Sequence, residues 1–376
     1  MIYFNILVFV CKLDNLVSKN CKRKNLIMRF TKNLLVLIAF ITSGSFLSAQ
    51  DIHFSQFYMS PLNLNPALTG VMNCNTRLVA NYRNQWSQIL RGDAYNTYSV
   101  SYDQKIAVGR SDYFGIGGTF WGDRAGALNL ATTQGRISFG YSKKMGGYRK
   151  SARYLVFGVD AGITQKRIDT ANAQWPSQHD GNGGYDATAV GGNQFITDPD
   201  FLHGDISAGL LFFNVIDDKS NYYVGLALHH LNQPGVSFLG NTNETLSSRL
   251  TLHGGGEFEM NRNMSILPGL IYMSQGQHRE INGGVSARFN LGSRTDGQSW
   301  QLGAWYRVGN QVDGGIHSDA FILSTRFDYG NYGIGFSYDV TVSKLSQAGT
   351  GNGAFEFSLN YLICGPEKRS VYCPRF

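Results

Sequence analysis

The stretch Tyr332-Gly-Ile-Gly-Phe-Ser-Tyr-Asp-Val340 decides the fold of this chain, because every second residue in it is apolar. The residues between them are Gly, Ser and Asp, which are tiny or polar. An alternation with a period of two places one set of side chains on each face of a β-strand. A strand with one apolar face and one polar or glycine face is typical of a membrane β-barrel wall.

The same alternation recurs along most of the chain, for example in Trp300–Val308 and in Phe355–Tyr361. The segments are about ten residues long, and an even number of them is expected for a bacterial single-chain barrel. The sequence therefore predicts an all-β fold, a single transmembrane antiparallel up-and-down β-barrel of about 14 strands. The predicted strands are 75–85, 94–106, 112–122, 128–143, 152–166, 203–215, 221–231, 248–260, 263–274, 278–290, 299–308, 318–328, 331–340 and 353–363.

The connections between these strands fall into two classes. Counted from the first, the odd connections include the long stretches 167–202 and 232–247, whereas the even ones include the turn-like 216–220 and 261–262. Only the short connection 275–277 departs from this rule. Outer-membrane barrels have long extracellular loops and short periplasmic turns, with both termini in the periplasm. A soluble β-sandwich has no reason to sort its loops in this way.

The first fifty residues have the features of an export leader. Met28–Lys32 is basic, Leu34–Phe40 is apolar, and Ser48-Ala49-Gln50 supplies small residues before Asp51. This order is that of a secretory signal peptide, and the apolar run is too short for a good transmembrane helix. Residues 1–27 precede a second plausible start at Met28, so we interpret 1–50 as a signal peptide behind a mis-assigned upstream leader.

The composition excludes several functional classes. Residues 1–50 hold seven Lys or Arg and one acid, so they carry most of the net charge of +7, and the basic balance does not indicate nucleic acid. Charged residues make up only 16% of the chain, below the ~25% that is typical of soluble domains, while aromatic residues reach 13%. No apolar run of about 18 residues follows the leader, which excludes helical membrane spans.

The sequence contains no motif that indicates catalysis, a cofactor or a metal. GxSxG and HExxH are absent, and the glycine-rich stretches do not complete GxGxxG. Asp180–Asp186 resembles part of a calcium loop but lacks the final Glu, and its residues also form ordinary turns. His229-His230 lacks a third ligand at a suitable spacing. We therefore expect no enzyme, no cofactor and no metal site.

Three cysteines remain after the leader: Cys74, Cys364 and Cys373. Exported chains form disulfides, and a bond between Cys364 and Cys373 would close a small terminal loop. We expect this pair as a possible disulfide in a periplasmic tail, residues 364–376.

The stretch Asp51–Gly70 has no period of its own. Its prolines disfavour both a helix and a sheet ladder, and its amides are suited to bonding polar lumen walls. We expect residues 51–74 to be an N-terminal plug or periplasmic segment, ahead of a barrel that spans 75–363. In the plug, Asn65-Pro66-Ala67 would make the turn and Ser55-Gln56 would contact the wall. The alternative is a disordered periplasmic arm that orders on a partner.

Three short motifs then occur in a fixed order. They are Asp51-Ile-His-Phe-Ser-Gln-Phe57, Pro61-Leu-Asn-Leu-Asn-Pro-Ala-Leu-Thr-Gly70, and Arg77-Leu-Val-Ala-Asn-Tyr-Arg83-Asn-Gln-Trp86 followed by Tyr98-Ser-Val-Ser-Tyr-Asp103. Through these motifs the chain resembles the PorP/SprF family of type IX secretion system outer-membrane proteins of Bacteroidetes. The motif residues that carry the resemblance are Ser55, Gln56, Asn65, Pro66, Ala67, Arg83, Asn84, Gln85 and Trp86. The strand count and length extend the resemblance over the whole chain after the leader.

The resemblance implies a non-enzymatic component of the outer membrane that works with the type IX secretion system. Some members link the barrel to periplasmic secretion or gliding-motility components and to peptidoglycan-associated protein. Others support the export or surface anchoring of secreted proteins such as adhesins, which present a cargo C-terminal domain. Embedding in the lipid bilayer and the absence of a nucleic-acid partner agree with the composition.

One alternative stays open at this point. A FadL-like outer-membrane channel for hydrophobic small molecules also has about fourteen strands and an N-terminal hatch with an Asn-Pro-Ala-like element. Such channels are usually longer and have a larger hatch than residues 51–72 would form. A TonB-dependent transporter needs a much larger barrel and a separate plug domain, and the length of the chain excludes it.

Overall fold

The computed structural model of the chain describes residues 51–109, 111–147, 151–171, 173, 175–179, 184–186, 188–189, 191, 196–217, 220–240, 244–291, 297–310, 315–343 and 352–365. Within these residues the chain forms fourteen β-strands. They are β1 (Thr76–Gln85), β2 (Tyr95–Val108), β3 (Asp112–Ala125), β4 (Leu130–Gly146), β5 (Ala152–Arg167), β6 (Asp200–Val215), β7 (Asn221–His229), β8 (Arg249–Asn261), β9 (Met264–Gln275), β10 (His278–Leu291), β11 (Gln298–Asn310), β12 (Ile316–Tyr329), β13 (Tyr332–Thr341) and β14 (Asn352–Ile363).

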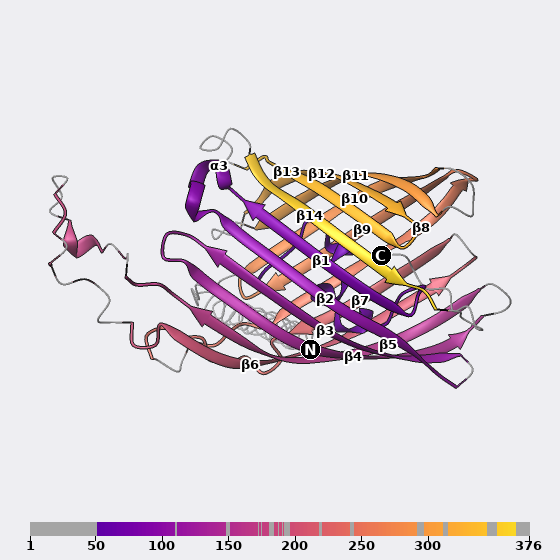
Figure 1. Cartoon of the computed structure of the whole chain (residues 1–376), viewed down its shortest axis with the longest axis horizontal. Helices are drawn as coiled ribbons and strands as arrows, with labels where there is room; N and C mark the ends of the chain where they lie inside the picture. Colours follow the sequence, from indigo (N-terminus) through magenta and orange to yellow (C-terminus); the bar gives the residue numbers. More distant parts are fainter. Residues whose placement is uncertain are drawn as a thin grey trace, which may run out of the picture. The chain divides into compact units, whose positions relative to one another are not determined.

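Each strand pairs antiparallel with its neighbours in the sequence, and β1 pairs with β14 to close the barrel. The strands lie side by side and run obliquely, as Figure 1 shows for β1 to β5. The closing seam is regular, from Thr76 opposite Ile363 to Gln85 opposite Ala354. The prediction of an antiparallel 14-stranded barrel is therefore confirmed. The largest difference in a strand start is in β6, which begins at Asp200.

The two ends of the barrel differ in their connections. One end, here called the long-loop end, carries the connections 168–199, 230–248 and 342–351. The other, the short-turn end, carries tight connections such as 262–263 and 330–331. Gly276 and Gln277 make the one very short connection seen at the long-loop end, between β9 and β10. In bacterial transmembrane barrels the long loops face outward and the short turns face the periplasm.

Alternating exposure along the strands defines the inner and outer faces of the wall. In β2, Tyr98, Val100 and Tyr102 are exposed, whereas Ser99 and Ser101 are buried. The exposed apolar face fits a lipid environment, and the buried polar face lines the lumen. Among the described residues, no helix is both long enough and apolar enough to cross a membrane.

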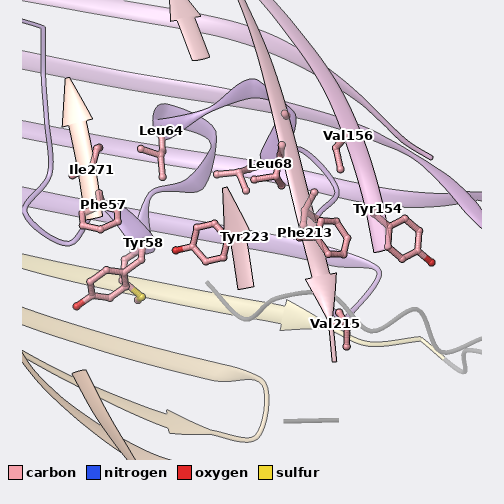
Figure 2. Packing of buried hydrophobic residues seen from close by; sticks show 14 of the residues in the cluster. Phe57, Tyr58, Leu64, Leu68, Tyr154, Val156, Phe213, Val215, Tyr223 and Ile271 are labelled. Carbon is pink, nitrogen blue, oxygen red and sulfur yellow. The ribbon is translucent and has the colours of Figure 1, made fainter. Parts of the chain in front are cut away.

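The described helices are all short. Three lie before the first strand, namely η1 (Phe57–Met59), α2 (Pro61–Leu64) and η2 (Pro66–Leu68), and the others are α3 (Ser87–Leu90), η3 (Arg91–Asp93) and η4 (Pro176–Gln178). The main apolar core lies between the first group and the inner wall. Figure 2 shows Phe57, Tyr58, Leu64 and Leu68 gathered with wall residues that include Tyr154, Phe213 and Tyr223. The lumen is therefore packed with apolar as well as polar side chains.

Candidate functional site

Residues 51–72, here called the inner segment, lie inside the barrel. Phe54–Leu62 and Leu64–Met72 are buried throughout. The inner segment forms hydrogen bonds with eleven strands, β1, β2, β4, β6–β9 and β11–β14. A single segment can contact strands on all sides of a closed barrel only from within the lumen. Its first residue contacts the long-loop end, and Gly70 contacts β2 nearer the short-turn end.

Ser55 lies at the centre of a buried charged cluster. This Ser55 cluster consists of Ser55, Arg83 of β1, Arg307 of β11, Asp339 of β13 and Glu356 of β14, none of them more than 3% exposed. Ser55 Oγ donates to Asp339 Oδ2 at 2.7 Å and accepts from Arg83 at 2.6 Å and from Arg307 at 2.9 Å. The backbone N–H groups of Ser55 and Gln56 donate to the two carboxylate oxygens of Glu356 at 2.6 and 2.9 Å.

The charges in the Ser55 cluster balance. Asp339 pairs with both Arg83 and Arg307, at 3.2 and 3.0 Å, and Arg83 also pairs with Glu356. Within the cluster two cations therefore meet two buried anions, and Arg307 also pairs with Asp319 of β12, just outside the cluster, at 2.6 Å. Charge-assisted hydrogen bonds of this kind are strong, but each partner depends on the others, because an unpaired buried charge is costly. The inner segment supplies three of the donors that satisfy the two carboxylates.

The β-ladder itself brings these wall residues together. Arg83 and Glu356 are direct partners across the β1–β14 seam, and Asp339 lies opposite Ala354 in the next pair of strands. All three point inward because they share the inner phase of the alternation. The sequence pattern thus indicates their common face, but it does not reveal that they meet at Ser55.

Asn65 fixes the turn between α2 and η2. Its Oδ1 accepts a hydrogen bond from Ala67 N at 2.8 Å, so Asn65 caps η2, and Pro66 occupies the first position of that helix. Its Nδ2 lies 3.2 Å from the carbonyl oxygens of Leu210 and Leu226 and 3.0 Å from His253 Nε2. One side chain therefore caps a helix and joins it to β6, β7 and β8.

Two wall glycines make room for this turn. A Cβ atom at Gly209 would overlap Asn65 Oδ1, and one at Gly158 would overlap the backbone of Pro66 and Ala67. Ala67 is completely buried against this part of the wall. Glycine inside a strand often marks the close approach of another backbone, and that is its role at both positions.

A second ion pair holds the inner segment nearer the short-turn end. Arg77 of β1 pairs with Asp103 of β2 at 2.8 Å, and both are buried. Asp103 Oδ2 also accepts from Gly70 N at 2.8 Å, while Arg77 donates to the carbonyl oxygens of Leu68 and Val71. The pair therefore binds the backbone of the inner segment directly.

At the opposite end, Asp51 is held by a group that we call the Asp51 clamp: Asp51, Asp205, His230, Arg249 and Gln275. His230 bonds to Asp51 through Nε2 and to Asp205 through Nδ1 at 2.9 Å. Arg249 lies 3.3 Å from Asp51, and the backbone N–H of Asp51 donates to Gln275 at 3.1 Å. A neutral imidazole carries only one N–H, so bonds to two carboxylates indicate a protonated His230.

The pKa values agree with this protonation. Burial alone would lower the pKa of His230, but the hydrogen bonds and charges of Asp205 and Asp51 outweigh it and raise that pKa to about 9. For Asp51, burial would raise the pKa, but the positive charge of Arg249 and the bond to His230 hold it well below its usual range. The clamp is therefore an ion-paired group at neutral pH.

The protein family described as type IX secretion system membrane protein PorP/SprF matches residues 46–361. This chain belongs to the PorP/SprF family. It is a membrane protein of the type IX secretion system, and its barrel lies in the outer membrane. No curated protein is similar enough in sequence to be matched.

Solved structures resemble this PorP/SprF chain only distantly. A bacterial polysaccharide outer membrane secretin is 10% identical, with 78% of this chain and 99% of that chain covered, at a TM-score of 0.36. CdiB from Escherichia coli is 7% identical, with 76% and 63% covered, at 0.44. A Pseudomonas aeruginosa FadL homologue is 13% identical, with 79% and 92% covered, at 0.38. These likenesses are too distant to transfer a function.

The PorP/SprF motif residues divide into two groups in space. Ser55, Gln56 and Arg83 meet in the Ser55 cluster, and Asn65-Pro66-Ala67 lies against β5 to β8. By contrast, Asn84, Gln85 and Trp86 lie at the long-loop end of β1. Asn84 donates to Asn96 of β2 at 2.7 Å, Gln85 accepts from Arg83 at 3.5 Å, and Trp86 N donates to Gly353 O at 2.8 Å. This second group joins the ends of β2, β1 and β14.

The expected disulfide between Cys364 and Cys373 is wrong, because Cys364 is bonded to Cys74. Cys74 and Cys364 lie just beyond the two strands of the closing seam, where Asn75 N donates to Ile363 O at 3.0 Å. Barrel closure brings together residues that are 290 positions apart in the sequence. The prediction relied on a short sequence separation. Cys373 lies outside the described residues.

Sequence reasoning also missed several contributors. Asp205 and Arg249 point inward in the alternation, but their partners in the inner segment are not visible from any spacing. Arg77 and Asp103 are part of the family motif, but the motif does not reveal that they bind the backbone of the inner segment. Among the described residues, no group of three His, Cys, Asp or Glu side chains is arranged to hold a metal. Residues 180–183 of the possible calcium loop lie outside the described residues.

Proposed function

We propose that this PorP/SprF barrel is a non-enzymatic docking and anchoring component of type IX secretion, and that folded cargo does not pass through it. The observation that carries the proposal is the inner segment, which fills the lumen and bonds to the wall on all sides. In this proposal residues 51–72 act as a resident plug that preserves the permeability barrier.

The energetic cost of removing the plug supports this role. Withdrawal would remove three donors from the two acids of the Ser55 cluster and the acceptor Ser55 Oγ from its two arginines, and would separate Asp103 from Gly70. A hydrogen bond to a charged group contributes about 1.5–3 kcal/mol, so several such contacts together resist displacement. A barrel of this size encloses more space than its own side chains fill but less than a folded adhesin needs.

The two ends of the barrel are then available for different partners. The long loops at one end would face secreted proteins such as adhesins, including a cargo C-terminal domain, at the cell surface. The short turns and the residues after β14 would face periplasmic secretion or gliding components and peptidoglycan-associated protein. We also propose that this chain functions in gliding in a member of the Bacteroidetes and that residues 1–50 contain a signal peptide. The family relationship supports both proposals.

The test is removal of the gene, followed by complementation with the full chain. We expect a specific adhesin or other cargo to be lost from the cell surface, as measured by mass spectrometry of surface proteins, while fatty-acid uptake is unchanged. Loss of uptake with a normal surface proteome would support the FadL-like alternative and overturn the proposal.

A photo-crosslinking pair tests whether cargo enters the lumen. A benzoylphenylalanine at Tyr58, which is buried inside the barrel, is compared with one at Leu239, which is 52% exposed in the loop after β7. Secreted cargo should not crosslink at Tyr58, and the loop position serves as the accessible control. Crosslinking of cargo at Tyr58 would contradict docking without passage.

A further inference from the structure

Two adjacent cavities lie between the start of the inner segment and the wall of β8 to β10. The first has a volume of about 30 Å³, and residues from Ile52 to Leu64 form one of its sides. The second also measures about 30 Å³. Both are lined by His53, Arg249, Met273 and Glu280, so they are neighbours along one face of the lumen.

Buried polar atoms around the first cavity have no hydrogen-bond partner within the described residues. They are Arg249 Nε, Thr251 Oγ1, Asn282 Oδ1 and His53 Nε2. Arg249, Thr251 and Asn282 are 9%, 1% and 2% exposed. Buried polar groups nearly always have a partner, often an ordered water, so this group calls for one. A cavity of this volume holds about two water molecules, and each needs two to four polar neighbours.

The second cavity connects this site to the long-loop end. Its lining includes His278 and Arg279, which are exposed at the start of β10, as well as Gln275 at the end of β9. Above it, the connection between β9 and β10 consists only of Gly276 and Gln277. The short connection that breaks the pattern of loop lengths therefore lies beside a place where the second cavity is lined by exposed residues.

The lining carries no net charge. Arg249 and Arg279 contribute two positive charges, and Asp51 and Glu280 contribute two negative ones. Arg249 is already paired with Asp51. An added ion would therefore lack a counter-charge. A neutral molecule that donates and accepts hydrogen bonds would satisfy Arg249 Nε, Thr251 Oγ1 and Asn282 Oδ1, and it could also bond to His53 Nε2, which lies 3.8 Å from a carboxylate oxygen of Glu280.

We propose that the face between Ile52–Phe57 and β8–β10 is a hydrated cleft, open toward the long-loop end, that binds small neutral hydrogen-bonding solutes. Water is the smallest of these, and a hydroxyl group of a larger solute meets the same donors and acceptors. The occlusion of the lumen is thus uneven. The Ser55 cluster seals the β11–β14 side, and the cleft leaves a polar site on the other.

Thiol labelling tests this proposal in the full-length chain, purified and placed in nanodiscs. Cys11→Ser, Cys21→Ser and Cys373→Ser remove the three cysteines that are not part of the Cys74–Cys364 bond. The probe is hydroxyethyl methanethiosulfonate, which is small, neutral and polar. Asn282→Cys reports on the cleft, and Ser337→Cys is the matched control. Asn282 lies four residues after the start of β10 at His278, and Ser337 lies four residues before the end of β13 at Thr341. Both of these strand ends are at the long-loop end, so the two sites lie at equal depth.

We expect Asn282→Cys to react at least about tenfold faster than Ser337→Cys, because a sealed site reacts only through local opening. Ser286→Cys, deeper on β10, should also react more slowly than Asn282→Cys if access is from the long-loop end. Heat-dependent migration on gels identifies the folded fraction. If Asn282→Cys does not fold, Thr251→Cys replaces it on the same cavity. Equal rates at Asn282 and Ser337, or faster labelling at Ser286, would overturn the proposal.

Discussion

Replacement of Glu356 by Gln tests how the plug is held. Glu356 accepts hydrogen bonds from Ser55 N, Gln56 N and Arg83 Nη1. Gln keeps the shape of the side chain but turns one oxygen into an NH₂ group that cannot accept. At least one of these donors then loses its partner, and Asp339 becomes the only anion of the cluster, although Arg307 keeps its pair with Asp319 at 2.6 Å.

Breaking a buried ion pair by removing one partner costs about 3–5 kcal/mol. The strand ladder is untouched, so we expect this cost to appear as loosening of the inner segment in a barrel that still folds. Hydrogen exchange, measured by mass spectrometry on a peptide that contains Ser55 and Gln56, should accelerate by roughly two to four orders of magnitude, since about 1.4 kcal/mol corresponds to tenfold.

Glu257→Gln is the matched control. Glu257 is also buried and pairs with Arg288 at 2.8 Å, but this pair joins β8 to β10 without a described hydrogen bond to the inner segment. It should therefore leave exchange at Ser55 and Gln56 near the wild-type rate. Unchanged exchange in Glu356→Gln, or the same acceleration in Glu257→Gln, would show that the Ser55 cluster does not hold the plug.

Three other features give separate predictions. His230 should titrate near pH 9 by NMR, and Asp51→Asn should lower that pKa. The ion pairs of protonated His230 stabilise the fold fully below about pH 6.5, and this stabilisation is lost as the pH rises through 9. Gly209→Ala should raise the permeability of reconstituted vesicles by displacing the helix cap, whereas Gly204→Ala on the same strand has free space and should not. Cys364→Ser should destabilise the barrel by about 2–5 kcal/mol and lower the midpoint of the heat-dependent gel shift, and reductant should have no further effect on it.

The barrel could be predicted from the sequence because its signal is local. Each strand carries its own alternation, as in Tyr332–Val340, and a lipid-facing wall demands that pattern along the whole strand. Strand ends are weaker signals, because polar loop residues continue the ladder without a change in composition. For that reason β6 extends from 203 back to Asp200, and β12 from 318 back to Ile316.

The contacts of the inner segment could not be predicted in the same way, because they are non-local. The inward phase of Arg83, Asp339 and Glu356 follows from alternation, but their meeting at Ser55 depends on closure of the barrel and on the path of residues 51–72. The same holds for Cys74 and Cys364, which only the β1–β14 seam brings together. Spacing in the sequence favoured Cys373, and spacing is a poor guide where a sheet closes on itself.

The two ends of the plug are held by different kinds of bond, and this difference determines where it can move. At the short-turn end the inner segment continues into β1, and Cys74 is bonded to Cys364 beyond β14. Movement there would have to break the seam of the barrel. At the long-loop end the described contacts of Asp51 are ion pairs and hydrogen bonds to His230, Arg249 and Gln275. We therefore expect any displacement of the inner segment from the lumen to begin at the Asp51 clamp, at the long-loop end.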